Sequence, residues 1–228
     1  MWLICTYVTP FGSRRFYVYQ PHFTQLIMRF LLFLSTYLVA IAVFGQTSFT
    51  EQLARHRDRY KKDLLASGGG PIKLEEDLTY VQFYAPDSTY RVEARVELTP
   101  RAEPFEMPTY SGATRTHVSY AVLSFVLRGK PQKLTLYRNL NLIRRPEYRD
   151  YLFLPFKDAT SGEASYGGGR YMDLRIGDIK NGMLTLDFNK AYNPYCAYSE
   201  GYPCPIPPKT NTVSVAVEAG EKAYGKSH

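Results

Sequence analysis

The chain has 228 residues, with 28 basic and 21 acidic side chains and a formal net charge of +7. The charges alternate in sign along Arg55–Lys62 and Arg91–Glu97, which is typical of solvated faces and not of a basic groove, so we expect no nucleic-acid partner. The sequence has no H-E-x-x-H, G-x-S-x-G, S-x-x-K or phosphate-loop motif. This excludes the common zinc peptidases, serine hydrolases, penicillin-binding enzymes and nucleotide hydrolases, and we expect no metal and no cofactor.

An apolar segment near the N-terminus predicts export. Phe30–Phe44 is uncharged and largely apolar, follows Met28 and Arg29, and precedes Gly45, which suits a small-residue cleavage site. The alternative is a membrane helix, but polar residues on both sides leave the run shorter than the roughly 20 apolar residues that spanning needs. We therefore predict a signal peptide cleaved near Gly45 and a periplasmic or secreted protein, which meets a membrane only during export.

The residues before that segment predict a misplaced start. Met1–Ile27 combines Arg14, Arg15, two prolines and aromatic residues without a period, which fits neither a core element nor the basic start of a signal peptide. We predict that translation begins at Met28. No cysteine follows the apolar run to carry a lipid anchor. Removing residues 1–45 leaves 25 basic and 21 acidic residues, a net charge of +4.

An amphipathic helix is predicted to open the mature chain. Ser48 and Glu51 form a capping box, and the helix should end at Gly68, within the linker Ser67–Pro71. Its apolar stripe consists of Phe49, Leu53, His56, Tyr60 and Leu64. No second histidine follows His56 three or four residues later, so a packed or rim position is favoured over a ligand for this side chain.

Beyond Pro71 the hydrophobic period changes from that of a helix to that of a strand. Tyr90–Leu98 alternates apolar with charged residues, which places one face on a core and one in water. Asn181 and Gly182 form a two-residue hairpin signal between two of the later strands, and Arg128–Pro131 predicts another turn. The further predicted strands are Thr116–Leu127, Lys133–Arg138, Tyr151–Phe156, Arg170–Ile176, Met183–Phe188 and Thr212–Glu218.

Short strands without a second long helix predict a mainly β fold. We expect an antiparallel sandwich or flattened barrel with one N-terminal amphipathic helix. The predicted organisation is a signal region over residues 1–45, a helix and glycine-rich linker over residues 46–70, and a single β-rich domain over residues 71–228.

Polar, glycine, tyrosine and asparagine residues gather in Pro155–Pro208 more densely than a core requires. The segments LFLPFKDATSGEASYGGGRYMDL, LDFNKAYNPYCAYSEGYPCPIPP and VAVEAGEK resemble the signature of the bacterial domain of unknown function 1684 family. The resemblance covers Leu78–Lys222, is strongest after Leu152, and is greatest to short exported members typical of Bacteroidetes. Longer members carry an additional N-terminal segment with a tryptophan- and glycine-bearing pattern, which the mature chain lacks. The resemblance implies a site but no activity, because the activity of the family is unassigned.

Matched residue by residue, the signature of that family falls on Phe156, Asp158, Thr160, Gly162, Tyr166, Gly169, Arg170, Tyr171, Asp187, Asn189, Tyr192, Asn193, Pro194, Cys196, Tyr198, Cys204, Pro205 and Pro207.

The glycine run before Arg170 has two interpretations. Main-chain amides of Gly167–Gly169 can form a nest for an anion, with Arg170 as a bidentate fork. A phosphate loop, however, is followed by a helix, whereas Arg170 opens a strand pattern. A glycine-rich hairpin or bulge is the favoured interpretation.

Two aspartates are candidates for general acid and base catalysis. Asp158 and Asp187 precede Thr160 and Asn189 on segments expected to be neighbours, so the two acids can form a carboxylate pair. The competing interpretation is that each binds nearby main-chain amides, with Arg170 as a structural counter-ion. The second interpretation is favoured.

Six tyrosines in the same region can wall a pocket for a sugar, a peptide or an aromatic ligand. Packing over a sheet end explains them nearly as well, but their asparagine and arginine neighbours favour a pocket. The predicted ligand-binding residues are Asp158, Tyr166, Gly168, Gly169, Arg170, Tyr171, Asp187, Asn189, Tyr192, Asn193 and Tyr198.

Cys196 and Cys204 are the cysteines that remain after signal removal. In an oxidising periplasm a disulfide between them is the first expectation, ahead of free buried thiols. Two cysteines without a nearby histidine make a poor zinc site, and a nucleophilic cysteine would need His56 or His117 as its base.

Two classes of function follow. The favoured one is a periplasmic or cell-envelope domain that binds a small polar ligand or a partner protein through its tyrosine, asparagine and arginine residues. The alternative is a hydrolase that uses Asp158 or Asp187, with Arg170 holding an anionic group of the substrate. A third interpretation is that Pro155–Pro208 only stabilises the sheet.

Overall fold

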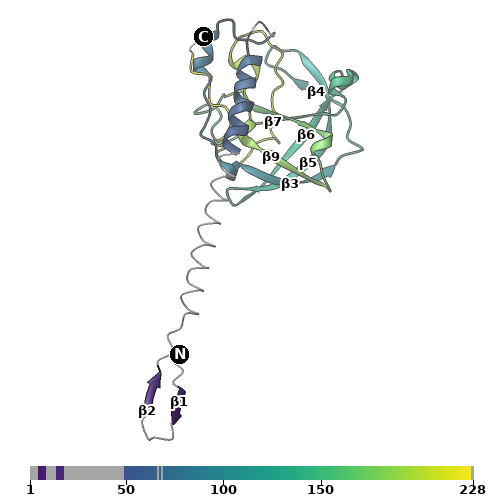
Figure 1. Ribbon diagram of the computed structural model, residues 1–228. Coiled ribbons are helices and arrows are strands. Elements are labelled where there is room, and N and C mark those ends of the chain that lie inside the picture. Colours follow the sequence, from purple (N-terminus) through teal and green to yellow (C-terminus); the bar gives the residue numbers. More distant parts are fainter. Residues whose placement is uncertain (1–4, 9–13, 18–48, 66, 68, 227–228) are drawn as a thin grey trace. The chain divides into compact units, whose positions relative to one another are not determined.

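The computed structural model describes residues 5–8, 14–17, 49–65, 67 and 69–226. The chain divides into two units, Met1–Phe49 and Thr50–His228. In the first, β1 (Cys5–Val8) and β2 (Arg14–Tyr17) form an antiparallel ladder (Figure 1). The predicted signal segment Phe30–Phe44 lies outside the described residues, so export and the start at Met28 stay predictions. Within the part of the chain that the structure describes, no helix is long and apolar enough to cross a membrane.

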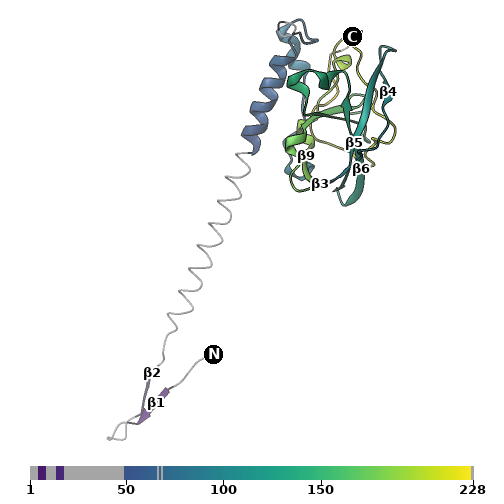
Figure 2. The same cartoon turned by 90° about the vertical axis from the view of Figure 1, so that its right-hand side faces the viewer.

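The second unit is built on one antiparallel sheet that curls into half a barrel (Figures 1 and 2). Its strands follow the order β8-β7-β6-β5-β3-β9, and β4 pairs with β5 beside β3. The strands are β3 (Arg91–Leu98), β4 (Phe105–Pro108), β5 (Thr114–Leu127), β6 (Lys130–Asn139), β7 (Tyr151–Phe156), β8 (Arg170–Arg175) and β9 (Met183–Asp187). The mainly β, antiparallel class is confirmed, with a single curled sheet as its form.

Alternation in the sequence located most of these strands. In β3, Ala94 is fully buried while Arg91, Glu93 and Arg95 are exposed, as the period of two predicts. The β5–β6 hairpin turns at Arg128 and Gly129, whose φ angles of 49° and 74° are typical of a tight two-residue turn. The four-residue strand β4 was not predicted, because it is short and ends in a proline.

One predicted strand is wrong, and one predicted hairpin is confirmed only at its turn. Thr212–Glu218 forms only an isolated bridge, from Thr212 to Lys157. Side chains compete for its main chain, since Arg170 binds the carbonyl of Val217 and Gln132 binds the amide of Ser214. An alternating pattern alone cannot reveal that competition.

The turn at Asn181 and Gly182 has the expected positive φ angles, 51° and 75°, but it does not pair β8 with β9. It joins Lys180 to Met183 in a single bridge. The strands β8 and β9 lie at opposite ends of the sheet, and no ladder joins them among the described residues. The half-barrel is therefore open along a seam between these two strands.

The N-terminal helix is confirmed and covers residues 49–63. The chain turns sharply after it, because Gly70 packs against the main chain of Leu64, where a Cβ would lie only 2.3 Å away. This close approach ends the helix before the predicted Gly68. Leu53 and Leu64 of its stripe are buried, and the helix lies along the sheet (Figure 2). Ser48 of the predicted capping box lies outside the described residues.

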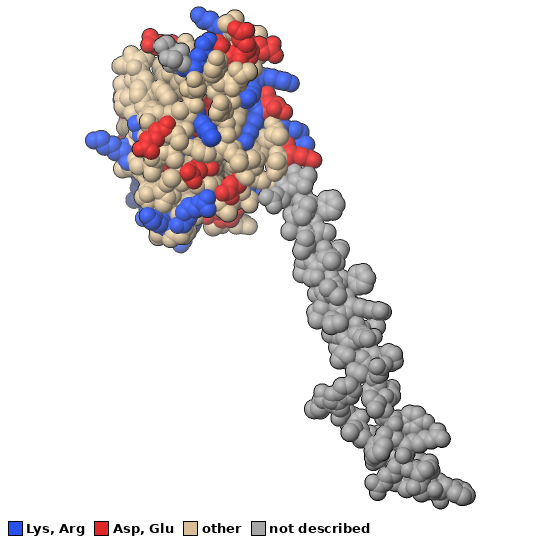
Figure 3. All heavy atoms as spheres, turned by 90° about the vertical axis from the view of Figure 1, so that its left-hand side faces the viewer, with Lys and Arg blue, Asp and Glu red and all other residues tan. Residues whose placement is uncertain are grey.

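The main core fills the inside of the half-barrel. Its fully buried side chains include Leu123, Leu136, Leu154, Phe156 and Leu186, from four of the strands. On the face shown in Figure 3, basic and acidic side chains are interspersed instead of forming one basic field. This distribution agrees with the expectation of solvated charged faces.

Candidate functional site

Arg170, the first residue of β8, is 1% exposed and lies at the centre of a buried polar cluster. Its Nη2 donates to Asp158 Oδ2 at 2.6 Å and to the carbonyl of Val217 at 2.8 Å. Its Nη1 donates to the carbonyls of Ala219 and Glu221, at 2.5 and 3.2 Å. The guanidinium therefore holds the C-terminal segment against the sheet and does not face solvent.

The carboxylate of Asp158 is equally occupied. Besides Arg170, it accepts the amide of Thr160 at 2.7 Å and the hydroxyl of Thr160 at 2.6 Å. That hydroxyl also lies 2.8 Å from the hydroxyl of Ser165. The contacts of Asp158 and Arg170 are those of a structural acid and its counter-ion, which was the favoured alternative for them.

The glycine run packs closely instead of forming an open anion nest. Gly169 has a φ of 89°, and a Cβ there would lie 2.6 Å from the carbonyl oxygen of Phe156. A Cβ on Gly168 would lie 2.2 Å from the ring of Tyr166. The carbonyl of Gly168 accepts the hydroxyl of Tyr110 at 3.0 Å. Glycine at these two positions is explained by close packing, in agreement with the favoured interpretation of a hairpin or bulge.

Sequence reasoning missed the fully buried Glu221. Its Oε1 accepts the hydroxyl of Tyr198 at 2.5 Å, and its Oε2 accepts the hydroxyl of Tyr60 at 2.9 Å and the amide of Asn193 at 2.8 Å. Burial raises its pKa to about 7, although these hydrogen bonds oppose the shift. Because Tyr60 belongs to the helix, this cluster ties the helix to the C-terminal segment. The only available signal was the place of Glu221 in the segment VAVEAGEK.

Asn189 and Asp187 form a turn at the end of β9. Asp187 Oδ1 accepts the amide and the side-chain Nδ2 of Asn189, at 3.1 and 2.9 Å. Asn189 is fully buried and also exchanges two hydrogen bonds with the main chain of Asp87. Asn189 is therefore a structural residue, whereas Asp187 also faces the cavity described next.

A cavity of about 1090 Å³ lies in the seam between β8 and β9, and we call it the seam cavity. One wall is β8, a second is β9, and the helix of residues 49–63 and the loop after Tyr192 complete it. Its lining includes His56, Arg59, Tyr60, Asp63, Arg91, Tyr171, Asp173, Asp178, Lys180, Asp187, Lys190, Tyr192, Tyr195 and Tyr202. This cavity is the candidate functional site.

The structure brings three of the predicted ligand-binding residues to the seam cavity: Tyr171, Asp187 and Tyr192. The other predicted residues lie outside its lining: Asp158, Tyr166, Gly168, Gly169, Arg170, Asn189, Asn193 and Tyr198. Two of these support it indirectly, because Tyr198 and Asn193 bind the same carboxylate as Tyr60, and Tyr60 lines the cavity. A ligand role for the rest stays a prediction.

Asp173 is the most distinctive group in the seam cavity. Its Oδ1 accepts the hydroxyls of Tyr151 and Tyr192, at 2.7 and 2.6 Å. Its side chain is accessible to solvent from the cavity, yet protein surrounds it on most sides, and this incomplete hydration raises its pKa. The two tyrosine hydroxyls and the charge of Arg175 oppose that shift without cancelling it. The sequence did not identify Asp173, because in an alternating strand it has the position of an ordinary solvated residue.

His56 lies half-buried in the cavity wall, as predicted for a rim residue. Burial lowers its pKa, and the charges of Lys190 and Arg59 lower it further, while Asp187 opposes them. The imidazole is therefore neutral near neutral pH. Among the described residues, no three histidine, cysteine, aspartate or glutamate side chains are grouped to hold a metal ion.

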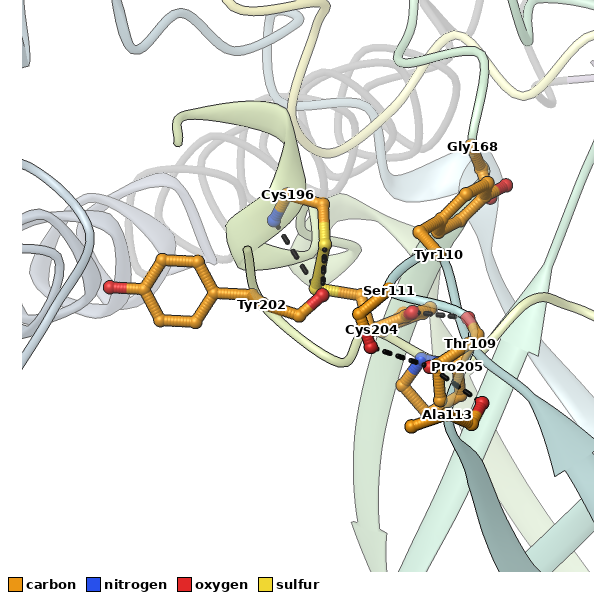
Figure 4. The surroundings of a disulfide bond; sticks show 10 residues. Thr109, Tyr110, Ser111, Ala113, Gly168, Cys196, Tyr202, Cys204 and Pro205 are labelled. Carbon is orange, nitrogen blue, oxygen red and sulfur yellow. Dashed lines mark hydrogen bonds between the residues drawn. A yellow bond between two sulfur atoms is a disulfide. The ribbon is translucent and has the colours of Figure 1, made fainter. Parts of the chain in front are cut away.

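The predicted disulfide between Cys196 and Cys204 is confirmed, with the two Cα atoms 6.3 Å apart. It fixes the loop that carries Tyr202 into the cavity wall, and Figure 4 shows the Tyr202 ring extending away from the turn around Thr109. The amide of Tyr110 donates to the carbonyl of Cys204 at 3.0 Å, and the hydroxyl of Tyr171 donates to the carbonyl of Pro205. The disulfide loop is therefore tied both to the end of β4 and to β8.

Comparisons with known proteins agree with this fold. The profile of the family described as "Protein of unknown function (DUF1684)" matches residues 76–222. The chain belongs to this family. An NMR structure of an uncharacterised protein from Haloarcula marismortui is 37% identical, covers 78% of this chain and 96% of its own, and superposes with a TM-score of 0.60. A search of curated proteins finds no match. The family match and the similar solved structure therefore support the fold and assign no activity.

Proposed function

We propose that this family member is an exported domain that binds a small polar ligand in the seam cavity. The observation that carries the proposal is an accessible carboxylate, Asp173, in a tyrosine-lined cavity of about 1090 Å³. Ligand sites in proteins are typically concave, of comparable volume, and lined by aromatic and apolar side chains with a few placed polar groups. An accessible carboxylate with a raised pKa is a further mark of such sites.

The occupancy of the acids favours binding over hydrolysis. A hydrolase that holds an anion with Arg170 would need that guanidinium at the site. In the structure, Arg170 donates its hydrogen bonds to Asp158 and to three carbonyls instead. Asp158 has no accessible oxygen for a substrate, since it is sealed with Arg170 and Thr160. Asp187 faces the cavity, but one of its oxygens is engaged by Asn189. Asp173, with one oxygen free of tyrosine hydroxyls, is better placed to contact a ligand.

The proposed periplasmic or secreted location has two supports. One is the uncharged run Phe30–Phe44, and the other is the disulfide Cys196–Cys204, a bond that persists in oxidising compartments. Under this proposal the natural protein begins near Gln46 after cleavage. Mass spectrometry of its N-terminal peptide tests this, and a peptide from before Met28 would contradict both the start and the cleavage.

The binding proposal is tested by a screen of the protein against sugars, peptides, organic acids and nucleotides. The readouts are the midpoint of thermal unfolding, which a ligand raises by mass action, and the amide NMR shifts of cavity residues. Asp173→Asn keeps the shape and both tyrosine hydrogen bonds but removes the charge. Glu163→Gln makes the same change on an exposed loop and is the matched control.

We expect one chemical class to raise the midpoint and shift cavity amides, and we expect Asp173→Asn to weaken the effect while Glu163→Gln leaves it unchanged. The absence of any shift at the cavity with every class would contradict the proposal. Binding that moves only amides distant from the seam cavity would contradict it equally.

A further inference from the structure

One oxygen of Asp173 is free to bind a ligand. Oδ1 accepts the hydroxyls of Tyr151 and Tyr192, but no described residue donates a hydrogen bond to Oδ2. A carboxylate has about four acceptor positions, so at least two stay open. The nearby cation Arg175 is engaged elsewhere, with Asp150 at 2.7 Å and the carbonyl of Glu147 at 2.9 Å. Within the described part of the chain Asp173 therefore has no ion-pair partner, and its ionised form presents a negative charge to the cavity.

Aromatic rings surround this end of the seam cavity. Tyr171 and Tyr192 meet edge to face with centroids 6.0 Å apart, and Tyr195 and Tyr202 do so at 5.2 Å. All four line the cavity with Asp173. The combination of a carboxylate with tyrosine rings suits an organic cation, because a positive charge is attracted both to the acid and to ring faces.

Basic side chains line the part of the cavity around His56. Arg59 and Lys190 both line it, both are exposed, and neither forms an ion pair with an acidic side chain in the described part of the chain. His56 lies within their field, which contributes to the lowering of its pKa. Asp187 partly offsets this charge, but its Oδ1 is turned to Asn189.

The cavity-facing residues of the helix also change in charge along its length. Arg59 lies one turn before Asp63, so the cavity wall changes from basic to acidic along residues 56–63. Asp63 and Asp173 together raise the pKa of Tyr195, after burial as the main cause. The cavity wall near His56 thus carries the basic groups Arg59 and Lys190, and the wall near Tyr195 carries the acids Asp63 and Asp173.

We propose that the seam cavity selects a small zwitterion, with its ammonium group on Asp173 among the tyrosines and its anionic group toward Arg59 and Lys190. This proposal rests on the binding function proposed above and specifies its ligand class. A primary ammonium donates to the open oxygen of Asp173 and fills the positions that no protein group occupies. Amino acids and short peptides with free ends have this chemistry.

Three probes that share one carbon chain test the charge pattern: 6-aminohexanoate, hexylamine and hexanoate. Each is titrated into the protein while cavity amide shifts and the unfolding midpoint are measured at equal concentrations. We expect the zwitterion to bind more tightly than either single-charge probe. Loss of a hydrogen bond to a charged group weakens affinity by about tenfold or more.

Two variants separate the ends of the cavity. Asp173→Asn should reduce the affinity for 6-aminohexanoate to that for hexanoate. Lys190→Gln should reduce it toward that for hexylamine, and as an exposed side chain its replacement leaves the fold intact. Glu163→Gln should preserve the full preference.

Two results overturn the zwitterion proposal. If hexanoate binds as tightly as 6-aminohexanoate, or if Asp173→Asn keeps the preference, the ligand class is wrong while binding in the cavity stands. If no probe and no member of the wider screen shifts a cavity amide, the binding function itself fails. The two failures are therefore distinguishable.

Discussion

Two polar groups on β8, Arg170 and Asp173, have opposite environments although only two residues separate them. Their odd spacing places them on opposite faces of the strand. Arg170 is 1% exposed and bonded to a carboxylate and three carbonyls, whereas Asp173 is open to a cavity and bonded on one oxygen only. One dense polar segment therefore contains both residues that stabilise the fold and residues that line a site. A site residue is identified by an acceptor atom without a hydrogen-bond donor and by access to a cavity. The local density of polar residues does not identify it.

The largest expected effect on the free energy of unfolding comes from Arg170, the structural member of this pair. Arg170→Ala leaves Asp158 buried without its partner and releases the C-terminal carbonyls, so we expect a loss of about 3–5 kcal/mol in the free energy of unfolding. Arg175→Ala on the same strand removes an exposed ion pair with Asp150 and should cost about 1 kcal/mol or less. Urea unfolding of both variants gives the comparison. Equal losses would refute a special structural role for Arg170.

The second prediction concerns pH. The pKa of Glu221 is raised from 4.5 to about 7, so the stability that this group contributes is fully present below pH 4.5 and is lost as pH rises through about 7. The loss amounts to about 3 kcal/mol at most. Glu221→Gln stays neutral and should remove this slope, whereas the exposed Glu218→Gln should keep it. Urea unfolding across that pH range decides, and an unchanged slope in Glu221→Gln would contradict the assignment.

The third prediction concerns the loop that carries Tyr202. The Cys196–Cys204 bond closes a loop with a sequence separation of 8, and losing it should cost about 2.5 kcal/mol in the chain-entropy picture. The double variant Cys196→Ala with Cys204→Ala, compared with the oxidised protein by thermal unfolding, measures this cost. Because Tyr202 lines the seam cavity, ligand affinity should fall as well. A variant of full stability and full affinity would show that the disulfide does not shape the site.

The smallest expected effect on stability comes from Asp173, the member of the pair that lines the cavity. Asp173→Asn keeps an acceptor for Tyr151 and Tyr192 and removes a charge whose ionised form is disfavoured, as its raised pKa shows. We expect a free energy of unfolding at neutral pH within about 0.5 kcal/mol of the parent, or slightly higher. The affinity for 6-aminohexanoate should fall to that for hexanoate in the same variant. A large destabilisation would show that Asp173, like Arg170, stabilises the fold.

Local pattern predicted the elements but not their order in space. β7 agrees with its predicted bounds, Tyr151–Phe156, and β3 agrees within one residue, because alternation and β-branched or aromatic residues act locally. The placement of β8 and β9 at opposite ends of the sheet depends on pairing between distant segments, which no local period encodes. Thr212–Glu218 has the alternation of a strand, but Arg170 and Gln132 bind its main chain.

The same limit applies to the site. Sequence reasoning identified Tyr171, Asp187 and Tyr192, which do line the seam cavity, because polar and aromatic residues cluster there. It missed Asp173 and Glu221 for a physical reason. These acids take their properties from groups that are distant in sequence: Tyr151 and Tyr192 around Asp173, and Tyr60 and Tyr198 around Glu221.

Titration of the Asp173 carboxyl carbon by NMR, with and without 6-aminohexanoate, tests the central claim most directly. Its neighbours Tyr151, Tyr192 and Arg175 are the groups that act on it. We predict a midpoint above the ordinary value of 3.8 in the free protein, and a lower midpoint with the probe, because an ammonium stabilises the ionised acid. An ordinary midpoint that the probe does not move would contradict the assignment of Asp173 to a ligand site.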